Sequence, residues 1–379
     1  MLPLGLVIPL LIPLLPLTFA HNIYELNTEY AGPTFFDEWG FFDNFDNLTE
    51  GSAIYVSAQV GASEKLAFVN EAGNAIIKVD NTTKLKDGAF RNTVRIQTNA
   101  VHGLGSLWVA DMVHVPYGCS VWPAWWSSAP SWPASGEIDT FEYVNLMPNG
   151  QMALHTLPGC TLDDSPSNKF TGLINSTDCS FEFNSNQGCV VQNTNSTAYG
   201  EGFANAGGGV FVTEFGVDGI SIWFFTRSAI PATLQNGTGD INTTMLGTPV
   251  ANFPASTCNL SFIEPQHLTL NIDLCGAFAG DPTIFAQTCS GSCYQDYVIG
   301  PPSTYDTAYF EIKSIRTYHD PLFPNAIVIP PPPNITQAAP PIFTGQPFAA
   351  APGVQGNIGW ALICSLFAIL FLGLTEGLL

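Results

Sequence analysis

The chain has 379 residues, and its 31 acidic and 10 basic side chains give a formal net charge of −21. Such an acidic surface repels phosphate backbones, which argues against nucleic acid as a partner. Only 11% of the residues are charged, while tryptophan, tyrosine, phenylalanine, asparagine and glycine are abundant. That composition suits a domain facing a neutral polymer.

Residues 1–20 form an almost purely apolar segment that ends in Phe19 and Ala20, where small residues flank a cleavable position. The length is typical of a secretory signal peptide and marginal for a membrane span. The alternative is an uncleaved N-terminal anchor, which the prolines of the segment disfavour because proline breaks helices. We therefore expect 1–20 to be a signal peptide and the protein to be secreted.

Residues 21–320 are long enough for one large all-β domain. No long amphipathic helical pattern occurs there, and short segments with period-two alternation or β-branched and aromatic residues recur between turn residues. The clearest of these segments are 53–56, 75–79, 93–97, 219–224 and 267–272. Many short strands joined by turns predict two packed antiparallel sheets, a β-sandwich.

Cysteine usage supports an extracytosolic address. One cysteine, Cys364, lies in an apolar tail, and the other eight are Cys119, Cys160, Cys179, Cys189, Cys258, Cys275, Cys289 and Cys293. An even set in a secreted chain predicts up to four disulfides, with the pairing left open. Cys289 and Cys293 have neither the spacing nor the partners of a zinc site.

Eight Asn-Xaa-Ser/Thr motifs agree with secretion and a glycosylated surface. They begin at Asn47, Asn81, Asn175, Asn195, Asn236, Asn242, Asn259 and Asn334.

The most informative stretch holds three carboxylates within a strand-like segment, at Glu137, Asp139 and Glu142. Alternate residues of a regular strand share a face, so Glu142 would point away from the other two. One β-bulge restores the register and brings Glu142 round beside them. The two glutamates can then reach the short carboxyl separation of a retaining glycosidase, with one as nucleophile and one as acid/base. Asp139 can orient the nucleophile and share a proton, because crowded acids raise one another's proton affinity.

Acid clusters on strands are also often a solvated face or a set of calcium ligands. Four tryptophans near the acids, Trp122, Trp125, Trp126 and Trp132, favour a sugar site instead. Sugar rings dock on aromatic faces while polar groups fix their orientation. We expect one or two of the four to line a cleft and the others to be core.

The C-terminal part of the chain predicts a tether. Segment 321–358 is rich in proline, which predicts an extended stalk. Residues 359–379 form an apolar tail without a basic flank, preceded by small residues at 349–351 and an uncharged spacer. This is the pattern of a GPI-attachment signal. The alternatives are a short transmembrane anchor and a dispensable tail. We therefore expect the C-terminal segment to anchor the protein at the membrane, so that the domain lies at the extracellular face of the plasma membrane or in the cell wall.

These residues resemble glycoside hydrolase family 16, in its fungal laminarinase-like branch. The resemblance extends over about residues 24–320, and its most specific element is GEIDTFE at 136–142 with the flanking Trp-Pro pairs. The other segments that carry it are WPA at 122–124, LHT at 154–156, PGC at 158–160, RNTVRI at 91–96, GGG at 207–209, WFFTR at 223–227 and IRTY at 315–318.

The resemblance implies a β-jelly-roll (concanavalin A-like) sandwich with a concave cleft, and endo-hydrolysis of β-1,3-glucan, and of mixed β-1,3/1,4-glucan, with retention. Carried over, Glu137 is the nucleophile, Asp139 its assistant and Glu142 the acid/base. His155 is expected beside the acid/base, and Trp126 and Trp132 are expected sugar platforms.

Other features add to or depart from the family's pattern. Trp122 is a further expected sugar contact. Relatives commonly carry an acidic residue followed by Trp where this chain has Ala277 and Phe278, which puts one glycone-side subsite in question. Arg91 and Arg95 are expected to pair with buried carboxylates, with substrate binding as the alternative.

Two alternatives to hydrolysis stay open at this point. In a glucan transglycosylase, a sugar hydroxyl rather than water resolves the glycosyl-enzyme intermediate. A non-catalytic glucan-binding wall protein would not need the intact acid trio. We expect a monomer that uses no cofactor and no metal at the site.

Overall fold

The structure is a computed structural model that describes residues 22–235, 237 and 239–330. The predicted signal peptide, most of the stalk and the C-terminal tail lie outside the described residues, so these assignments stay predictions. Within the described ranges, no helix has the length and apolar character needed to cross a membrane.

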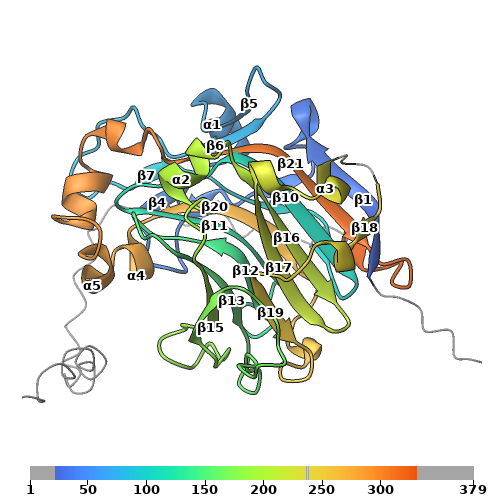
Figure 1. Cartoon of the computed structure of the whole chain (residues 1–379). Coiled ribbons are helices and arrows are strands. Elements are labelled where there is room, and N and C mark those ends of the chain that lie inside the picture. The colour runs from blue at the N-terminus through green and yellow to red at the C-terminus, as the bar shows by residue number, and fades with distance from the viewer. Residues whose placement is uncertain (1–21, 236, 238, 331–379) are drawn as a thin grey trace, which may run out of the picture. The chain divides into compact units, whose positions relative to one another are not determined.

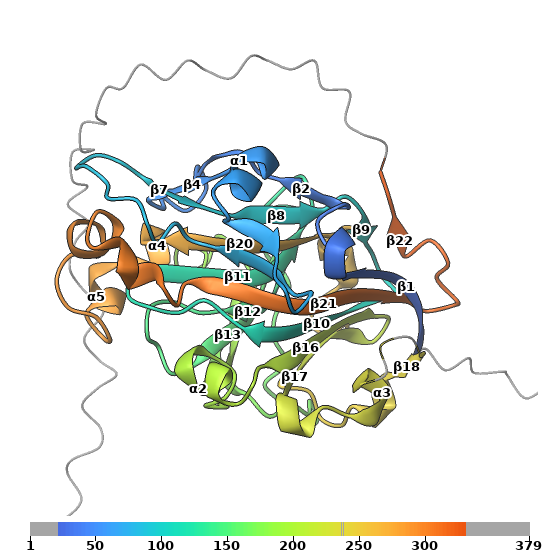
Figure 2. The same cartoon turned by 90° about the horizontal axis from the view of Figure 1, so that it is seen from above.

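Two large antiparallel sheets form the domain (Figures 1 and 2). The first, called here the back sheet, has the order β18-β1-β21-β10-β16-β17-β19, with β6 and β5 joined to β21. Its strands are β1 (Ile23–Ala31), β5 (Ala67–Val69), β6 (Ala75–Lys78), β10 (Ser106–His114), β16 (Gly209–Gly216), β17 (Gly219–Thr226), β18 (Ile241–Asn242), β19 (Ala251–Pro254) and β21 (Tyr309–His319).

The second sheet, called here the cleft sheet, has the order β14-β15-β13-β12-β11-β20-β8-β2. Its strands are β2 (Trp39–Phe41), β8 (Arg95–Thr98), β11 (Val121–Ser128), β12 (Glu137–Glu142), β13 (Gly150–His155), β14 (Leu173–Ser176), β15 (Cys189–Asn193) and β20 (His267–Leu274).

Smaller elements complete the domain. Two minor sheets consist of β3 (Asn44–Phe45), β4 (Ala53–Tyr55) and β7 (Arg91–Thr93), and of β9 (Val101–His102) and β22 (Ile327–Val328). The helices are α1 (Ala58–Ser63), α2 (Gly200–Asn205), α3 (Ala232–Gln235), α4 (Gly276–Ala279) and α5 (Pro282–Phe285). Short 3-10 turns cover Gly32–Thr34, Arg227–Ala229, Thr243–Met245, Leu260–Phe262 and Pro302–Tyr305, and Cys293–Val298 forms a π-helical turn. Helices α4 and α5 lie beyond the end where β11 begins and β20 ends (Figures 1 and 2).

Apolar side chains from both sheets meet in one core. Phe141 of β12 packs on Phe211 of β16, with ring centroids 5.3 Å apart, and on Phe310 of β21 at 6.1 Å. The hydroxyls of Thr140 and Thr213 lie 2.5 Å apart between the same two sheets. Such face-to-face contacts define a sandwich, and the predicted all-β fold of two antiparallel sheets is confirmed.

The centre of the back sheet is buried on both faces. Most residues of strand β10 are apolar, and nearly every one of them is buried. The face turned away from the main core packs into a second cluster that includes Leu107, Val109, Tyr24 and Trp223. A strand covered on both sides has no solvated face, so its sequence loses the alternation of polar and apolar residues.

The strand predictions agree with the structure in four of five segments, with boundaries shifted by a few residues. Segment 93–97 is not one strand, because buried Val94 separates β7 from β8. The predicted stalk also starts too early at 321. Strand β22 pairs with β9, and the Gly103 amide donates to the Ala326 carbonyl at 2.6 Å. The folded domain therefore continues to Val328.

All eight cysteines of the body form disulfides, as predicted. The pairs are Cys119–Cys289, Cys160–Cys258, Cys179–Cys189 and Cys275–Cys293. Two of these disulfides, Cys119–Cys289 and Cys275–Cys293, tie the segment that carries α4 and α5 to the start of β11 and the end of β20.

Candidate active site

Strand β12 carries the three acids, and it contains the bulge that the sequence predicts. Its register with β11 pairs Trp126 with Asp139 and Trp125 with Phe141, so Thr140 is the extra residue. The bulge lets Phe141 enter the core while Asp139 and Glu142 both line the cleft with Glu137. Directly before the strand, Gly136 has φ +82°, and a Cβ there would lie 2.6 Å from the Phe262 carbonyl oxygen. Only glycine fits that turn.

Glu137 lies at the start of β12, where it accepts a hydrogen bond from the Trp132 indole N–H. Its side chain also bonds to that of Asp139. Burial, followed by the negative charge of Asp139, raises the pKa of Glu137 to about 8. Since neighbouring anions disfavour further ionisation, the pair retains a proton more readily than an isolated glutamate.

Asp139 is paired with a histidine from β13. The His155 Nε2 lies 3.2 Å from Asp139 Oδ2, and its Nδ1 lies 3.0 Å from Asn186 Oδ1. Burial raises the pKa of Asp139. Burial alone would lower the pKa of His155, but the hydrogen bond to Asp139 and the three carboxylates outweigh it and raise that pKa to about 10. At neutral pH the imidazole is therefore a cation that donates from both nitrogens.

Glu142 ends the strand with both oxygens held. Trp122 Nε1 donates to Oε1 at 2.9 Å, and Gln151 Nε2 donates to Oε2 at 3.0 Å. Burial raises the pKa of Glu142, against the effect of these donors and of His155. His155 was expected beside Glu142. Its direct contact is instead with Asp139, because His155 pairs with Glu137 in the β12–β13 register, whereas Gln151 pairs with Glu142.

The three acids lie in a cleft of about 700 Å³. Trp122, Trp126 and Trp132 line it, whereas Trp125 is fully buried in the core. Three of the four tryptophans therefore reach the cleft, more than the one or two expected. The alternation along β11 explains this, because Trp122, Ala124 and Trp126 share the cleft face while Trp125 faces the other sheet.

The two arginines of the RNTVRI segment have different roles. Arg91 is fully buried, donates to the carbonyls of Val298 and Asp80, and lies 3.9 Å from the Asp80 carboxylate. Arg95 lines the cleft, with its guanidinium carbon 4.6 Å from the Phe42 ring centroid and 5.1 Å from that of Trp126. Such stacking favours a fixed tryptophan platform.

The end of the cleft at β20 holds a second group of acids, which sequence reasoning missed. Asp273 and Asp46 both line the cleft and are buried. The Thr49 hydroxyl lies 2.7 Å from Asp273 Oδ2 and 2.8 Å from Asp46 Oδ2. A hydroxyl donates one proton, so one of the two contacts requires a protonated carboxyl. Burial and the nearby Asp46 raise the pKa of Asp273 to about 7, which assigns the proton to Asp273.

The departure at Ala277 and Phe278 lies at this same end. Both residues line the cleft, and the Phe278 ring meets Trp122 edge-on with centroids 5.5 Å apart. Phe278 therefore supports the indole that holds Glu142, and Ala277 supplies no charge.

One ligand atom each of Glu137, Asp139 and His155 lie within 4.8 Å of one another, a spacing that a metal ion can use. The described contacts of the three acids fit a network that shares a proton beside aromatic walls.

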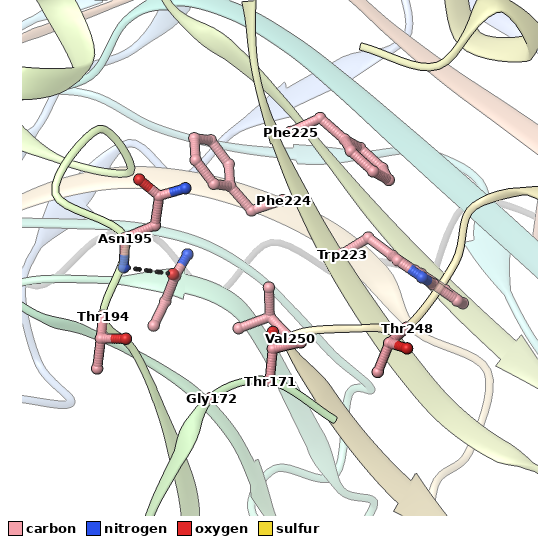
Figure 3. A pocket seen from close by; sticks show the side chains of 10 residues that line it. Thr171, Gly172, Thr194, Asn195, Trp223, Phe224, Phe225, Thr248 and Val250 are labelled. Carbon is pink, nitrogen blue, oxygen red and sulfur yellow. Dashed lines mark hydrogen bonds between the residues drawn. The ribbon is translucent and has the colours of Figure 1, made fainter. Parts of the chain in front are cut away.

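A second pocket of about 250 Å³ lies away from the acids (Figure 3). Trp223, Phe224 and Phe225 of β17 line it together with Thr171, Thr194 and Asn195, and Phe224 lies on the side of Asn195. Its described lining holds no carboxylate and no histidine, so it offers no acid–base chemistry.

Comparison with known proteins points to one family. The model of the XgeA-like catalytic domain of glycoside hydrolase family 16 matches residues 39–318. A probable glycosidase of Schizosaccharomyces pombe is 36% identical over 79% of this chain and 70% of its own length. A probable endo-1,3(4)-β-glucanase of Aspergillus fumigatus is 38% identical over 78% of this chain, but the match spans only 45% of that protein.

Two solved structures share both sequence and fold with this chain. Laminarinase 16A from Phanerochaete chrysosporium, with β-glucans in both donor and acceptor sites, is 33% identical with a TM-score of 0.75, over 78% of this chain and 100% of its own. An elongating family 16 β-1,3-glucosyltransferase is also 33% identical, with a TM-score of 0.70, over 78% of this chain and 99% of its own.

Proposed function

Because this chain belongs to glycoside hydrolase family 16, we propose that it is an endo-acting, retaining hydrolase of β-1,3-glucan and of mixed β-1,3/1,4-glucan. The observation that carries the proposal is the bulged strand β12, which presents Glu137, Asp139 and Glu142 together in a cleft walled by tryptophans. Relatives named endo-1,3(4)-β-glucanases support the substrate class.

In the first step, the Glu137 carboxylate attacks the anomeric carbon while Glu142 gives its proton to the leaving oxygen. The Glu137–Asp139 hydrogen bond lets the shared proton reside on Asp139, which frees Glu137 to attack. Burial raises the pKa of Glu142, which favours the protonated form that an acid requires.

In the second step, the Glu142 carboxylate takes a proton from water, and the water oxygen displaces Glu137 from the sugar. The Trp122 and Gln151 donors hold both Glu142 oxygens in place during the two steps. The Trp132 indole stabilises Glu137 as it departs.

The second candidate is transglycosylation, favoured by the 33% identity to an elongating β-1,3-glucosyltransferase. The same two glutamates would serve, with a sugar hydroxyl as acceptor in place of water. A purely glucan-binding role is disfavoured, because binding needs neither the acid trio nor its proton network.

The test compares the wild-type protein with Glu137→Gln on branched β-1,3-glucan, recording new reducing ends and product length. Accumulating reducing ends and short products that are absent in the variant would support hydrolysis. Redistributed chain lengths without net reducing ends would support transglycosylation, and no change with either protein would leave the binding role.

We also propose that the protein is secreted and anchored at the cell surface, where glucan walls lie. The four disulfides support an oxidising compartment. The N-terminal and C-terminal apolar segments of the sequence support secretion and anchoring. The test is to treat intact cells with a phospholipase that cleaves GPI anchors and to follow the protein by detergent phase partitioning before and after treatment. Release into the aqueous phase would indicate a GPI anchor, and retention in the detergent phase would indicate a transmembrane anchor.

A further inference from the structure

Asn175 begins an Asn-Ser-Thr motif on β14, the outermost strand of the cleft sheet. Its side chain is exposed and lines the catalytic cleft, near Phe181 and Asn186. No hydrogen bond joins its side-chain amide to another described residue. The amide nitrogen is therefore open to glycosylation at the rim of the cleft.

The other described motifs differ from this one. Asn81 uses its amide in the fold, because Nδ2 donates to Asp306 at 2.6 Å and Oδ1 accepts from Lys78 at 2.8 Å. Asn195 is exposed but lines the separate pocket at Trp223 (Figure 3). Among the motif asparagines that the structure describes, Asn175 alone lines the catalytic cleft.

The local structure accommodates a sugar chain. The register between β14 and β15 shifts at Asn175, so it stands out of the regular ladder. Leu173 and Ile174 just before it are exposed, at 58% and 38%, and offer an apolar surface for sugar faces. Disulfides place the folding of this chain in an oxidising compartment, where N-linked oligosaccharides are also attached.

We propose that an N-linked oligosaccharide on Asn175 forms a wall of the catalytic cleft at its β14 end and limits how much glucan lies there. The inference rests on the proposed function. From β12 to β14 there are three strand spacings, through β13 and β15, or roughly 14 Å. Only a short stretch of substrate then fits between the acids and the glycan.

The affected end is the one that receives the leaving chain. The resemblance to family 16 places the segment at Ala277 and Phe278 on the glycone side, and Asn175 lies at the opposite end of the sheet order. A sugar acceptor must occupy the aglycone end to intercept the glycosyl-enzyme. A glycan there disfavours sugar acceptors more than water, and so directs the enzyme toward hydrolysis.

The experiment uses the full chain, secreted from a eukaryotic host, with two variants that lose the motif, Asn175→Gln and Thr177→Ala. Thr177 bonds through its backbone carbonyl, which accepts from the Leu162 amide at 2.8 Å, so its side chain is expendable. Thr177→Ser keeps the motif, and Asn195→Gln removes a distant one. Trimming the folded wild-type protein to a single sugar per site tests the same point without mutation.

Peptide mass spectrometry first measures occupancy of Asn175, which is independent of activity. We expect loss of the glycan to raise kcat/KM on laminarin oligosaccharides of seven or more units by about fivefold, as for a gained sugar contact. The ratio of transfer products to hydrolysis products should rise by about the same factor. The rate of trisaccharide cleavage should not change when the glycan is lost. The Thr177→Ser and Asn195→Gln variants should have the same rates and product ratios as the wild type.

An unoccupied Asn175 overturns the inference, and so do equal product patterns before and after trimming. If the wild-type protein makes neither reducing ends nor transfer products, the proposed function fails instead. Calorimetric binding of long oligosaccharides to glycosylated and trimmed Glu137→Gln protein then decides the glycan's role. Equal affinities would overturn it, and tighter binding after trimming would support it.

Discussion

The cleft holds two groups of buried carboxyls, and their partners differ. Glu137, Asp139 and Glu142 have side-chain partners, namely two indoles, an amide and a cationic imidazole. Asp46 is held by the backbone amides of Leu48, Thr49 and Gly51. Asp273 accepts from the Leu274 amide, and at Gly51 an added Cβ would lie 2.0 Å from Asp273 Oδ1. Apart from the Thr49 hydroxyl that Asp46 and Asp273 share, these partners are backbone amides, which suit a fixed structure, whereas the side-chain partners of the first group suit chemistry.

This difference makes the two groups separable by experiment. Changes in the β12 acids should alter rates and leave stability nearly unchanged. Changes at Asp273 should alter stability and its pH dependence, with smaller effects on the chemical step.

The largest expected effect is that of Glu137→Gln. Loss of the proposed nucleophile should lower kcat by about 10⁴-fold or more, while the melting temperature stays within a few degrees because glutamine keeps the shape of glutamate. Steady-state assay and calorimetry check both. Residual activity above a tenth of wild type would break the distinction between the groups.

The next effect is that of His155→Gln. The variant loses the cation that favours ionised Glu137 and Asp139, so their pKa values rise. Because the nucleophile must be ionised, the acid limb of the pH–rate profile should move to higher pH. The value of kcat at pH 6 should fall by about 10²-fold. An acid limb in the wild-type position would mean that His155 only fills space.

Asp273→Asn should change stability rather than rate. The folded pKa of about 7 exceeds the unfolded value of about 4, so stability from the protonated form is complete below about pH 4 and is lost as pH rises to about 7. Asparagine imitates the protonated acid and can donate to Thr49 at any pH.

The Asp273→Asn variant should therefore gain about 4 kcal/mol over wild type at pH 8 and nothing at pH 4. Denaturant titrations at the two pH values measure this. A constant difference across pH would show that Asp273 does not carry the proton.

The smallest effect is expected for Trp122→Phe, which sharpens the assignment of Glu142. The indole N–H lowers the pKa of Glu142, so its loss should raise that pKa. The alkaline limb of the kcat profile, where the acid loses its proton, should therefore move to higher pH. Phe278→Leu, which leaves the indole donor, is the control. A downward shift would contradict the role of Glu142 as acid.

The sequence predicted the acid trio because the chemistry constrains it tightly. Three acids needed on one face of a strand, with an odd spacing, require a bulge, and a bulge lies at Thr140. Gln151 was missed, although it lies on the same strand face as His155, four residues before it. Its role depends on the β12–β13 register, which no local pattern supplies.

The Asp46–Asp273 pair was missed for a different reason. Thr269, Asn271 and Asp273 alternate with Leu268, Leu270 and Ile272 along β20, and that alternation does signal a polar face. The partner of Asp273 lies 227 positions earlier in the chain, and only the folded sheet brings the two together. Long-range pairings of this kind leave no periodicity in the sequence.

The place of β21 in the back sheet has a consequence for biosynthesis. This late strand, Tyr309–His319, lies between β1 and β10 and also pairs with β6. A ribosome that has made the first 300 residues has therefore produced a back sheet with a gap, and the hydrogen-bonding edges of β1 and β10 that face β21 have no partner strand. Chaperones must therefore bind the incomplete sheet until β21 emerges. A chain that ends before residue 309 should accordingly be insoluble rather than a shortened enzyme.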